Sequence, residues 1–129
     1  MTPEAAIEEL LRFDGPVQYT GRIAKRDLEL RGREIKAGQG VRLFLGSANR
    51  DPEVFDSPDT LDLSRAPNKH LAFGAGIHFC LGAPLARLEA SIMLPELFAR
   101  FPDLRLADQE LRWRPAPVLR GLEALNVLV

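Results

Sequence analysis

A single cysteine lies in a glycine-rich loop directly before a predicted helix, and this placement suggests metal chemistry. The loop spans residues 73–82 with the sequence FGAGIHFCLG, and Cys80 is the only cysteine of the chain. Glycine lets a backbone approach a flat ligand closely and adopt conformations that other residues avoid. At a helix N-terminus, free N–H groups and the helix dipole favour the thiolate, which is the form of cysteine that binds metals.

Other interpretations of a lone cysteine have to be weighed. Composition alone favours a small buried hydrophobic side chain. A zinc site needs about four ligands, mostly cysteine and histidine, whereas this chain offers only Cys80, His70 and His78. A single cysteine also excludes an internal disulfide. The residues around Cys80 therefore decide its role.

The bulk composition predicts an ordinary globular chain. Its 129 residues predict one domain, and 46% hydrophobic with 27% charged residues is typical of soluble proteins. A net charge of −1 gives no reason to expect nucleic acid or an anionic membrane as a partner. No apolar run has the length of a membrane span, and the N-terminus lacks a secretory signal pattern. We expect a cytoplasmic location.

Three kinds of segment precede the cysteine loop. Thr2, followed by proline and glutamate, is typical of a helix N-terminus and predicts a helix over residues 3–13. Residues 17–45 alternate short apolar runs with turns and predict strands, with turn positions at Gly32 and Gly38. Residues 49–69 are interrupted by prolines and predict an irregular segment whose apolar residues pack.

A helix and further strands are predicted after the loop. Residues 83–101 have helical spacing, and Pro95 inside this run predicts a kink. We expect residues 111–129 to form two or three strands with a turn near Arg120-Gly121. These segments together predict an α+β fold. The apolar positions predicted to mark the buried side of the helix are Leu85, Leu88, Ile92, Leu94, Leu97, Phe98 and Phe101.

The cysteine loop resembles the haem-binding signature of the cytochrome P450 family, and Leu85-Ala86-Arg87 resembles the bacterial members. The signature positions are filled by Phe73, Gly76, His78, Cys80 and Gly82. The resemblance implies that residues 1–129 are the incomplete C-terminal part of the mainly α cytochrome P450 fold. The implied order is helix, small β-sheet, irregular meander, cysteine loop, helix and β-hairpin. The implied cofactor is haem b (iron protoporphyrin IX), with Cys80 as the thiolate ligand of iron.

Glu9 and Arg12 resemble the Glu-x-x-Arg pair of the same family. Residues three apart share one face of a helix and can form an ion pair, although an exposed pair would contribute little to stability. In the family an arginine of the irregular segment joins this pair and supports the cysteine loop. Arg65 is the best match to that arginine.

The resemblance also implies haem contacts outside the iron ligand. Arg22 and His78 correspond to the partners of the two haem propionates, although Arg22 considered alone is more simply an exposed strand residue. The other implied haem-contacting residues are Phe73, Gly74, Gly82 and Ala83. The N–H groups of Gly82 and Ala83 are expected to donate to the sulfur. His70 has no implied role, and we expect a structural histidine whose ring nitrogens are hydrogen-bonded.

The function implied by the resemblance is that of a haem-thiolate monooxygenase. It would insert one oxygen atom from O2 into a small organic substrate, with electrons from a ferredoxin-type donor, because an axial thiolate favours O–O cleavage. Family members are much longer, and the helix that delivers protons to dioxygen has no counterpart here. We therefore expect no catalytic residue in this chain and no activity from the chain alone.

Two alternatives remain open. The chain could be a non-catalytic haem-binding or interaction fragment that needs a separate N-terminal part. It could also be a globular fold with a buried cysteine and no cofactor.

Overall fold

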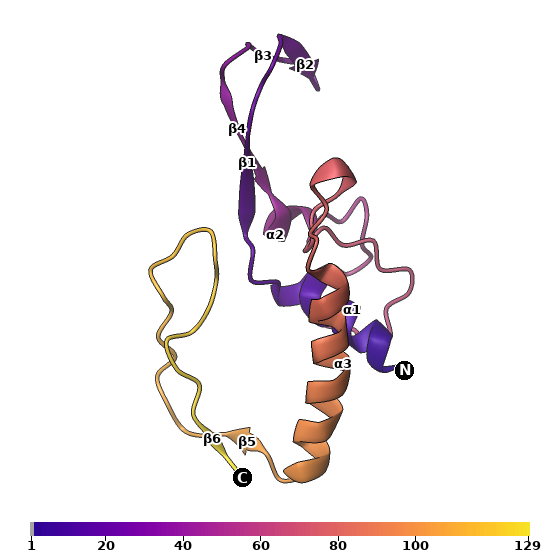
Figure 1. Cartoon of the computed structure of the whole chain (residues 1–129), viewed down its shortest axis with the longest axis vertical. Coiled ribbons are helices and arrows are strands. Elements are labelled where there is room, and N and C mark those ends of the chain that lie inside the picture. The colour runs from indigo at the N-terminus through magenta and orange to yellow at the C-terminus, as the bar shows by residue number, and fades with distance from the viewer. Residues whose placement is uncertain (1) are drawn as a thin grey trace.

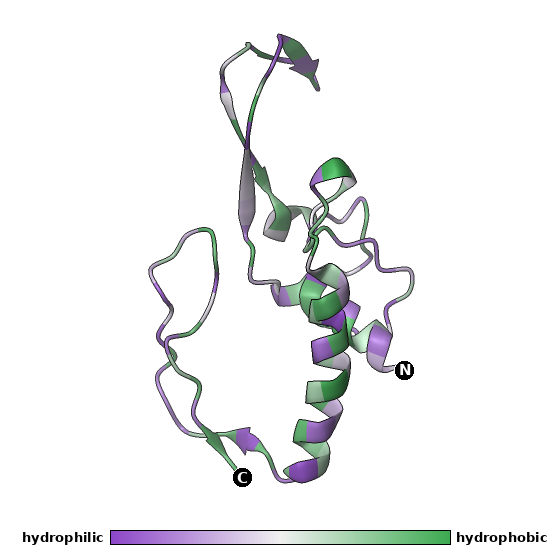
Figure 2. Ribbon diagram, in the orientation of Figure 1, coloured by the Kyte–Doolittle hydropathy of each residue, from purple (hydrophilic) through white to green (hydrophobic). Residues whose placement is uncertain are grey.

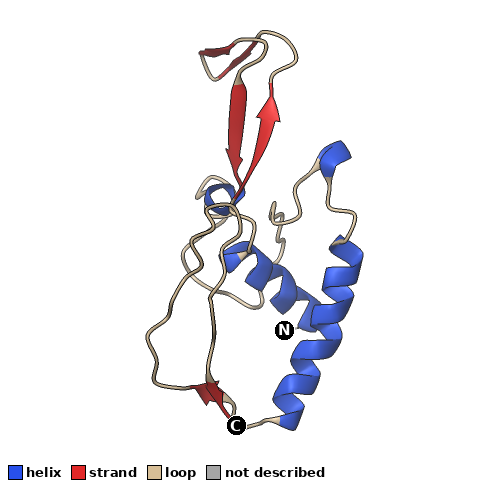
Figure 3. Cartoon of the chain, turned by 60° about the vertical axis from the view of Figure 1, so that its left-hand side comes forward, coloured by secondary structure: helices blue, strands red, loops and turns tan. Residues whose placement is uncertain are grey.

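The computed structural model describes residues 2–129 as two long helices, short antiparallel strands and long irregular segments (Figure 1). The elements in chain order are α1 (Pro3–Asp14), β1 (Tyr19–Ile23), β2 (Leu28–Leu30), β3 (Arg33–Ile35), β4 (Gly40–Phe44), α2 (Leu45–Ala48), the 3-10 turn η1 (Gly76–His78), α3 (Ala83–Arg100), β5 (Arg105–Leu106) and β6 (Val127–Leu128). This mixture of helices and small sheets confirms the predicted α+β class. Figure 3 shows that α1 and α3 cross, while the hairpin of β1 to β4 projects away from them and the β5–β6 pair lies near the C-terminal end of α3.

Helix α1 forms where the sequence predicted it. The Thr2 hydroxyl accepts a hydrogen bond from the Ala5 N–H at 3.2 Å, which satisfies one free donor of the first turn. The helix ends at Asp14, one residue beyond the predicted end. A Cβ at Gly15 would lie 2.5 Å from the Leu11 carbonyl oxygen, so only glycine fits the close exit of the chain from this helix.

The strands of the first half form two antiparallel pairs. β1 pairs with β4, with Tyr19 opposite Phe44, and β2 pairs with β3 at the far end of the same hairpin. Gly32 and Gly38 have φ angles of +75° and +85°, which confirms both as turn positions. Figure 1 shows this long hairpin extending away from the helices.

The segment between α2 and the cysteine loop has no regular structure, but it packs as predicted. Phe55 is 4% exposed, and the Arg12 guanidinium lies 5.2 Å from the centroid of its ring. The segment therefore covers the buried side of α1, and the small core of the molecule lies between them.

Helix α3 packs against α1 through small side chains. Ala83 is completely buried, and Ala86, Ala90 and Leu94 line a shallow groove against α1. The prediction that the large apolar residues mark its buried side holds for Leu94, which faces α1, and is wrong for five of the other six, because α1 covers the alanine side instead. Leu85, Leu88, Ile92, Leu97 and Phe98 are between 37% and 59% exposed. The hydropathy colours of Figure 2 show hydrophobic residues recurring along α3.

The helix continues through Pro95 as one element, and the expected kink stays a prediction.

The C-terminal tail is less regular than predicted. β6 is the strand that forms within residues 111–129, and it pairs with β5 rather than within the tail. Isolated antiparallel bridges join Trp113 to Leu122 and Val17 to Leu119. The turn expected near Arg120-Gly121 is displaced, because the bends lie at Pro115, Pro117 and Val118, while the Arg120 side chain donates to Asp14 at 2.8 Å. The tail is thus held both by bonds within itself, such as the Arg114 N–H to the Gly121 carbonyl, and by contacts with α1 and the residues that follow it.

Among residues 2–129, no helix has both the length and the apolar character needed to cross a membrane.

Candidate functional site

A groove of about 280 Å3 lies where the end of α1, strand β1, helix α2 and the cysteine loop meet. It brings together five of the residues predicted to bind haem, which are Arg22, Phe73, Gly74, His78 and Cys80. The remaining wall is largely apolar and consists of Leu11, Pro16, Val17, Thr20, Leu45 and Ala72. Segments about 70 positions apart in the sequence thus share one surface.

The cysteine loop is held by its own backbone. The Cys80 N–H donates to the Phe73 carbonyl at 2.9 Å, and the Phe79 N–H donates to the Gly76 carbonyl at 3.0 Å. Gly74 and Gly76 have φ angles of +72° and +65°, which side chains rarely adopt. The loop therefore folds back on itself and leaves Cys80 exposed beside the groove.

Gly82 and Ala83 follow the cysteine and begin α3. A Cβ at Gly82 would lie 3.8 Å from the Cys80 Sγ, in ordinary van der Waals contact with the sulfur. The Ala83 N–H donates to the Cys80 carbonyl oxygen at 3.2 Å, rather than to the sulfur as expected. The reason is local, because the tight turn into α3 directs this donor back along the chain. The buried side chain of Ala83 supports α3 and does not line the groove.

Arg22 and His78 supply the polar groups of the groove. The Arg22 Nη1 donates to the Thr20 hydroxyl at 3.0 Å and to the Gly21 carbonyl at 2.7 Å, which fixes a half-buried positive charge on β1. His78 lies at the end of η1. A mostly apolar groove with a guanidinium, an imidazole and a thiol fits a flat apolar group that carries carboxylates and a metal.

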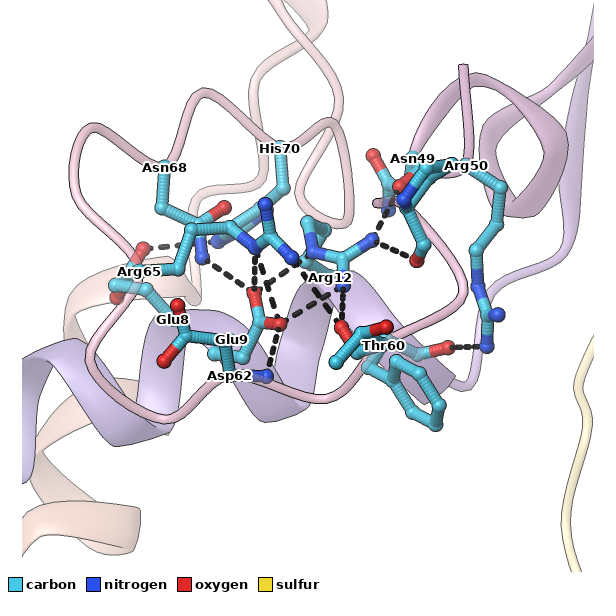
Figure 4. Close-up of polar contacts among 12 residues, drawn as sticks. Glu8, Glu9, Arg12, Asn49, Arg50, Thr60, Asp62, Arg65, Asn68 and His70 are labelled. Carbon is cyan, nitrogen blue, oxygen red and sulfur yellow. Dashed lines mark hydrogen bonds and ion pairs between the residues drawn. The ribbon is translucent and has the colours of Figure 1, made fainter. Parts of the chain in front are cut away.

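A buried ion pair lies on α1, the helix that contributes Leu11 to the groove (Figure 4). Glu9 and Arg12 are 0% and 1% exposed, and they form two hydrogen bonds of 2.7 and 2.8 Å. This confirms the predicted pair, whereas the alternative of an exposed salt bridge is wrong. Arg65 also donates to Glu9, with its Nε 3.1 Å from Oε2, as the resemblance implied.

The buried pair is linked to the segment that leads into the cysteine loop. The Arg12 Nη1 donates to the Asn49 carbonyl at 2.8 Å, and the Asn49 side-chain oxygen accepts from the Leu71 N–H at 2.7 Å. Asp62 and Asn68 also donate to the Glu9 carboxylate, at 2.9 and 3.0 Å. Glu9 and Arg12 therefore fix the irregular segment on α1 close to the loop.

The electrostatics of Glu9 depend on these donors. Burial by itself raises the pKa of the Glu9 carboxyl. The hydrogen bonds from Arg12, the Asp62 N–H and Arg65 outweigh burial and lower the pKa from 4.5 to about 2. Glu9 is thus a carboxylate at neutral pH, and its charge is compensated by the two arginines.

A second cluster of charged residues was missed by sequence reasoning. Arg87 on α3 donates two hydrogen bonds to Glu8 on α1, at 2.6 and 2.8 Å. His70 contacts the same carboxylate, with its Nε2 2.8 Å from Oε2, and its Nδ1 accepts from the Ala72 N–H at 3.1 Å. This confirms His70 as a structural histidine. The resemblance of Leu85-Ala86-Arg87 to the bacterial members was a signal that Arg87 matters. The sequence does not indicate which residue Arg87 pairs with.

Comparisons with known proteins agree with this arrangement. The family model described as Cytochrome P450 matches residues 3–112. The chain is 51% identical over 122 residues to the biotin biosynthesis cytochrome P450 of Bacillus subtilis, covering 95% of this chain and 31% of that protein. It is 48% identical over 127 residues to the cytochrome P450 monooxygenase PikC of Streptomyces venezuelae, covering 96% of this chain and 30% of PikC.

Solved structures match over nearly the whole chain. P450BioI, in complex with an acyl carrier protein ligated to hexadec-9Z-enoic acid, gives a TM-score of 0.94 at 50% identity, covering 97% of this chain and 32% of that one. CYP109E1 from Bacillus megaterium, in complex with testosterone, gives 0.93 at 47% identity, with 96% and 35% covered. The chain therefore spans about a third of the length of the proteins that it matches. On its sequence match and its fold, the chain belongs to the cytochrome P450 family.

Proposed function

We propose that residues 1–129 form the C-terminal haem-binding portion of a haem-thiolate monooxygenase. The observation that supports this most strongly is the groove, which collects an exposed thiol, a guanidinium and an imidazole from β1 and the cysteine loop around an apolar wall. A haem has complementary parts: an apolar ring for the apolar wall, two carboxylates for the guanidinium and the imidazole, and a metal for the thiol. The match of the family model is independent support.

Each residue predicted to bind haem has a proposed role toward haem b. Cys80 would be the thiolate ligand of iron, while Arg22 and His78 would pair with the propionates. Phe73 and Gly74 would lie against the ring, and the Gly82 N–H would donate to the sulfur. Ala83 contributes indirectly, as the buried first residue of α3 behind the ligand.

When bound, the haem would supply the activation of O2 and the transfer of one oxygen atom to a small organic substrate. The contribution of this chain is the charge and the orientation of the ligand. An anionic sulfur donates electron density to iron, and the Phe73 carbonyl fixes the backbone that carries it. We place the oxygen-activating groups outside this chain, and we propose a ferredoxin-type protein as the electron donor.

The test is haem binding by the full chain and by a Cys80→Ser variant. We expect the wild-type chain to give the thiolate-type absorption spectrum in its ferrous carbon monoxide complex, and the variant to lose it. A His78→Ala variant serves as the matched control, because it should weaken haem binding and still give the thiolate-type spectrum. If Cys80→Ser retains that spectrum, Cys80 is not the ligand.

A second candidate is a haem-binding fragment that functions only with a separate polypeptide. The exposed apolar side chains of α3 favour it, because such surfaces are typical of interaction sites. Size-exclusion chromatography with added haem and a turnover assay of the chain with redox partners test this second candidate. A haem-bound monomer without turnover would support the fragment, and turnover by the chain alone would eliminate it.

A further inference from the structure

We propose that Glu8, His70 and Arg87 form a positioning cluster at the junction of α1 and α3, and that this cluster fixes the position of the Cys80 backbone. We call these three residues the junction cluster. None of them lines the groove, so their effect on the sulfur would be indirect. This inference rests on the proposed role of Cys80 as the iron ligand.

The first element of the cluster is a two-bond ion pair between the helices. The Arg87 Nε and Nη2 donate to the two oxygens of Glu8 at 2.6 and 2.8 Å, across 79 positions of sequence. Two parallel bonds fix the orientation of both groups as well as their distance. The Arg87 hydrogen bond lowers the pKa of Glu8 and raises that of Arg87, so both groups stay charged at neutral pH.

The second element is a histidine whose two nitrogens have different partners. The Nδ1 of His70 accepts the Ala72 N–H, so the proton of the neutral ring lies on Nε2 and is donated to Glu8. The His70 side chain is 3% exposed. Glu8 therefore ties α3 and the start of the cysteine loop to the same point on α1.

The third element connects the cluster to Cys80 through Phe73. The Arg87 guanidinium lies 4.7 Å from the centroid of the Phe73 ring, and the His70 ring lies 6.2 Å from it. The carbonyl of the same Phe73 accepts the Cys80 N–H at 2.9 Å. Two members of the cluster thus hold the side chain of Phe73, while its backbone holds the residue that carries the sulfur.

A comparable ion pair elsewhere in the chain provides a matched control. Arg120 donates to Asp14 at 2.8 Å, and its guanidinium lies 3.7 Å from the centroid of the Trp113 ring. Like Arg87, Arg120 donates to a carboxylate and lies over an aromatic ring. It also attaches a distant segment to α1. It holds the C-terminal tail, however, and has no contact with Phe73 or Cys80.

The experiment measures amide hydrogen exchange in the full chain without haem. In Arg87→Leu we expect about tenfold faster exchange at the Cys80 amide, which is the scale of one lost charge-assisted hydrogen bond. The Leu11 amide inside α1 should change much less, and Arg120→Leu should leave the Cys80 amide unchanged. If Arg87→Leu does not fold, Arg87→Lys replaces it, because lysine keeps the charge but cannot form the paired bonds.

The results separate positioning from general stability. Equal acceleration at Cys80 and Leu11 would mean that Arg87 only stabilises the fold, and it would overturn the proposal, as would an unchanged Cys80 amide. With haem added, the junction variants should show a smaller thiolate-type fraction in the ferrous carbon monoxide spectrum than the Arg120 variant. A wild-type chain without that spectrum would contradict the proposed function, whereas the exchange result would still decide the positioning role.

Discussion

At the scale of single residues, the chain surrounds one buried carboxylate with donors from four residues. Glu9 accepts hydrogen bonds from Arg12, Arg65, Asn68 and the Asp62 N–H while it is completely buried. A buried charge without partners is costly, so removing one partner leaves the other uncompensated. The acid stability of the chain should therefore depend strongly on this residue.

The pKa of Glu9 gives the sign of this pH dependence. Its pKa is about 2 in the folded chain against 4.5 for the ordinary group, so the carboxylate stabilises the fold fully above pH 4.5. This contribution, about 3 kcal/mol, is lost as the pH falls toward 2. Urea unfolding between pH 7 and pH 2 measures it.

Two variants test the assignment to Glu9. Glu9→Gln should lower stability at pH 7 by about 3 kcal/mol and flatten the acid dependence. Glu29→Gln is the control, since Glu29 lies exposed on β2, and it should retain the acid dependence of the wild-type chain. An equally steep acid dependence in Glu9→Gln would contradict this account.

At the scale of elements, the C-terminal end of α1 positions one side of the groove wall. The helix stops at Asp14, and the chain passes Gly15 directly beneath the Leu11 carbonyl before Pro16 and Val17 enter the groove wall. Leu11 belongs to the same wall. The path of the chain at Gly15 thus sets the position of Pro16 and Val17 relative to Leu11 in the groove wall.

A methyl group at position 15 should disturb this exit. The Cβ of Gly15→Ala would lie 2.5 Å from the Leu11 carbonyl oxygen, so the backbone must shift. We expect a loss of about 1–3 kcal/mol in urea unfolding, together with weaker haem binding. Gly21→Ala is the matched control, because its Cβ meets nothing within 4 Å, and it should stay within about 0.5 kcal/mol of the wild type.

At the scale of the whole molecule, much apolar surface is left exposed on one long helix. α3 uses its alanines against α1, while Leu88, Ile92 and Phe98 are 56–58% exposed. Leu88 and Ile92 are four residues apart and therefore neighbours on the helix, and such exposed apolar neighbours present more surface than isolated residues do. Such a surface should bind the fluorescent dye anilinonaphthalene sulfonate.

A charge placed within this surface should reduce dye binding without unfolding the chain. Ile92→Lys should lower the dye fluorescence and leave the unfolding free energy within about 0.5 kcal/mol. Leu30→Lys is the control, because Leu30 is 60% exposed but lies on the hairpin away from α3. Equal loss of fluorescence in the two variants would show that α3 has no special surface.

The sequence by itself determined the features that depend on short-range geometry. Thr2 and Pro3 predicted where α1 begins, Gly32 and Gly38 predicted turns, and the cysteine loop carried its family signature. These signals are readable because capping, glycine torsion angles and proline act within a few residues of the chain. The Glu9–Arg12 pair could be predicted for the same reason, since its members are three residues apart on one helix.

Only the tertiary structure decided which surfaces meet. The apolar pattern of α3 did not indicate that alanines would face α1, because a pattern identifies the apolar residues but not what covers them. The pairing of Glu8 with Arg87 spans 79 positions, and the direction of the Ala83 N–H depends on the turn that precedes α3. Such contacts depend on how distant segments are placed in space, which local sequence signals do not specify.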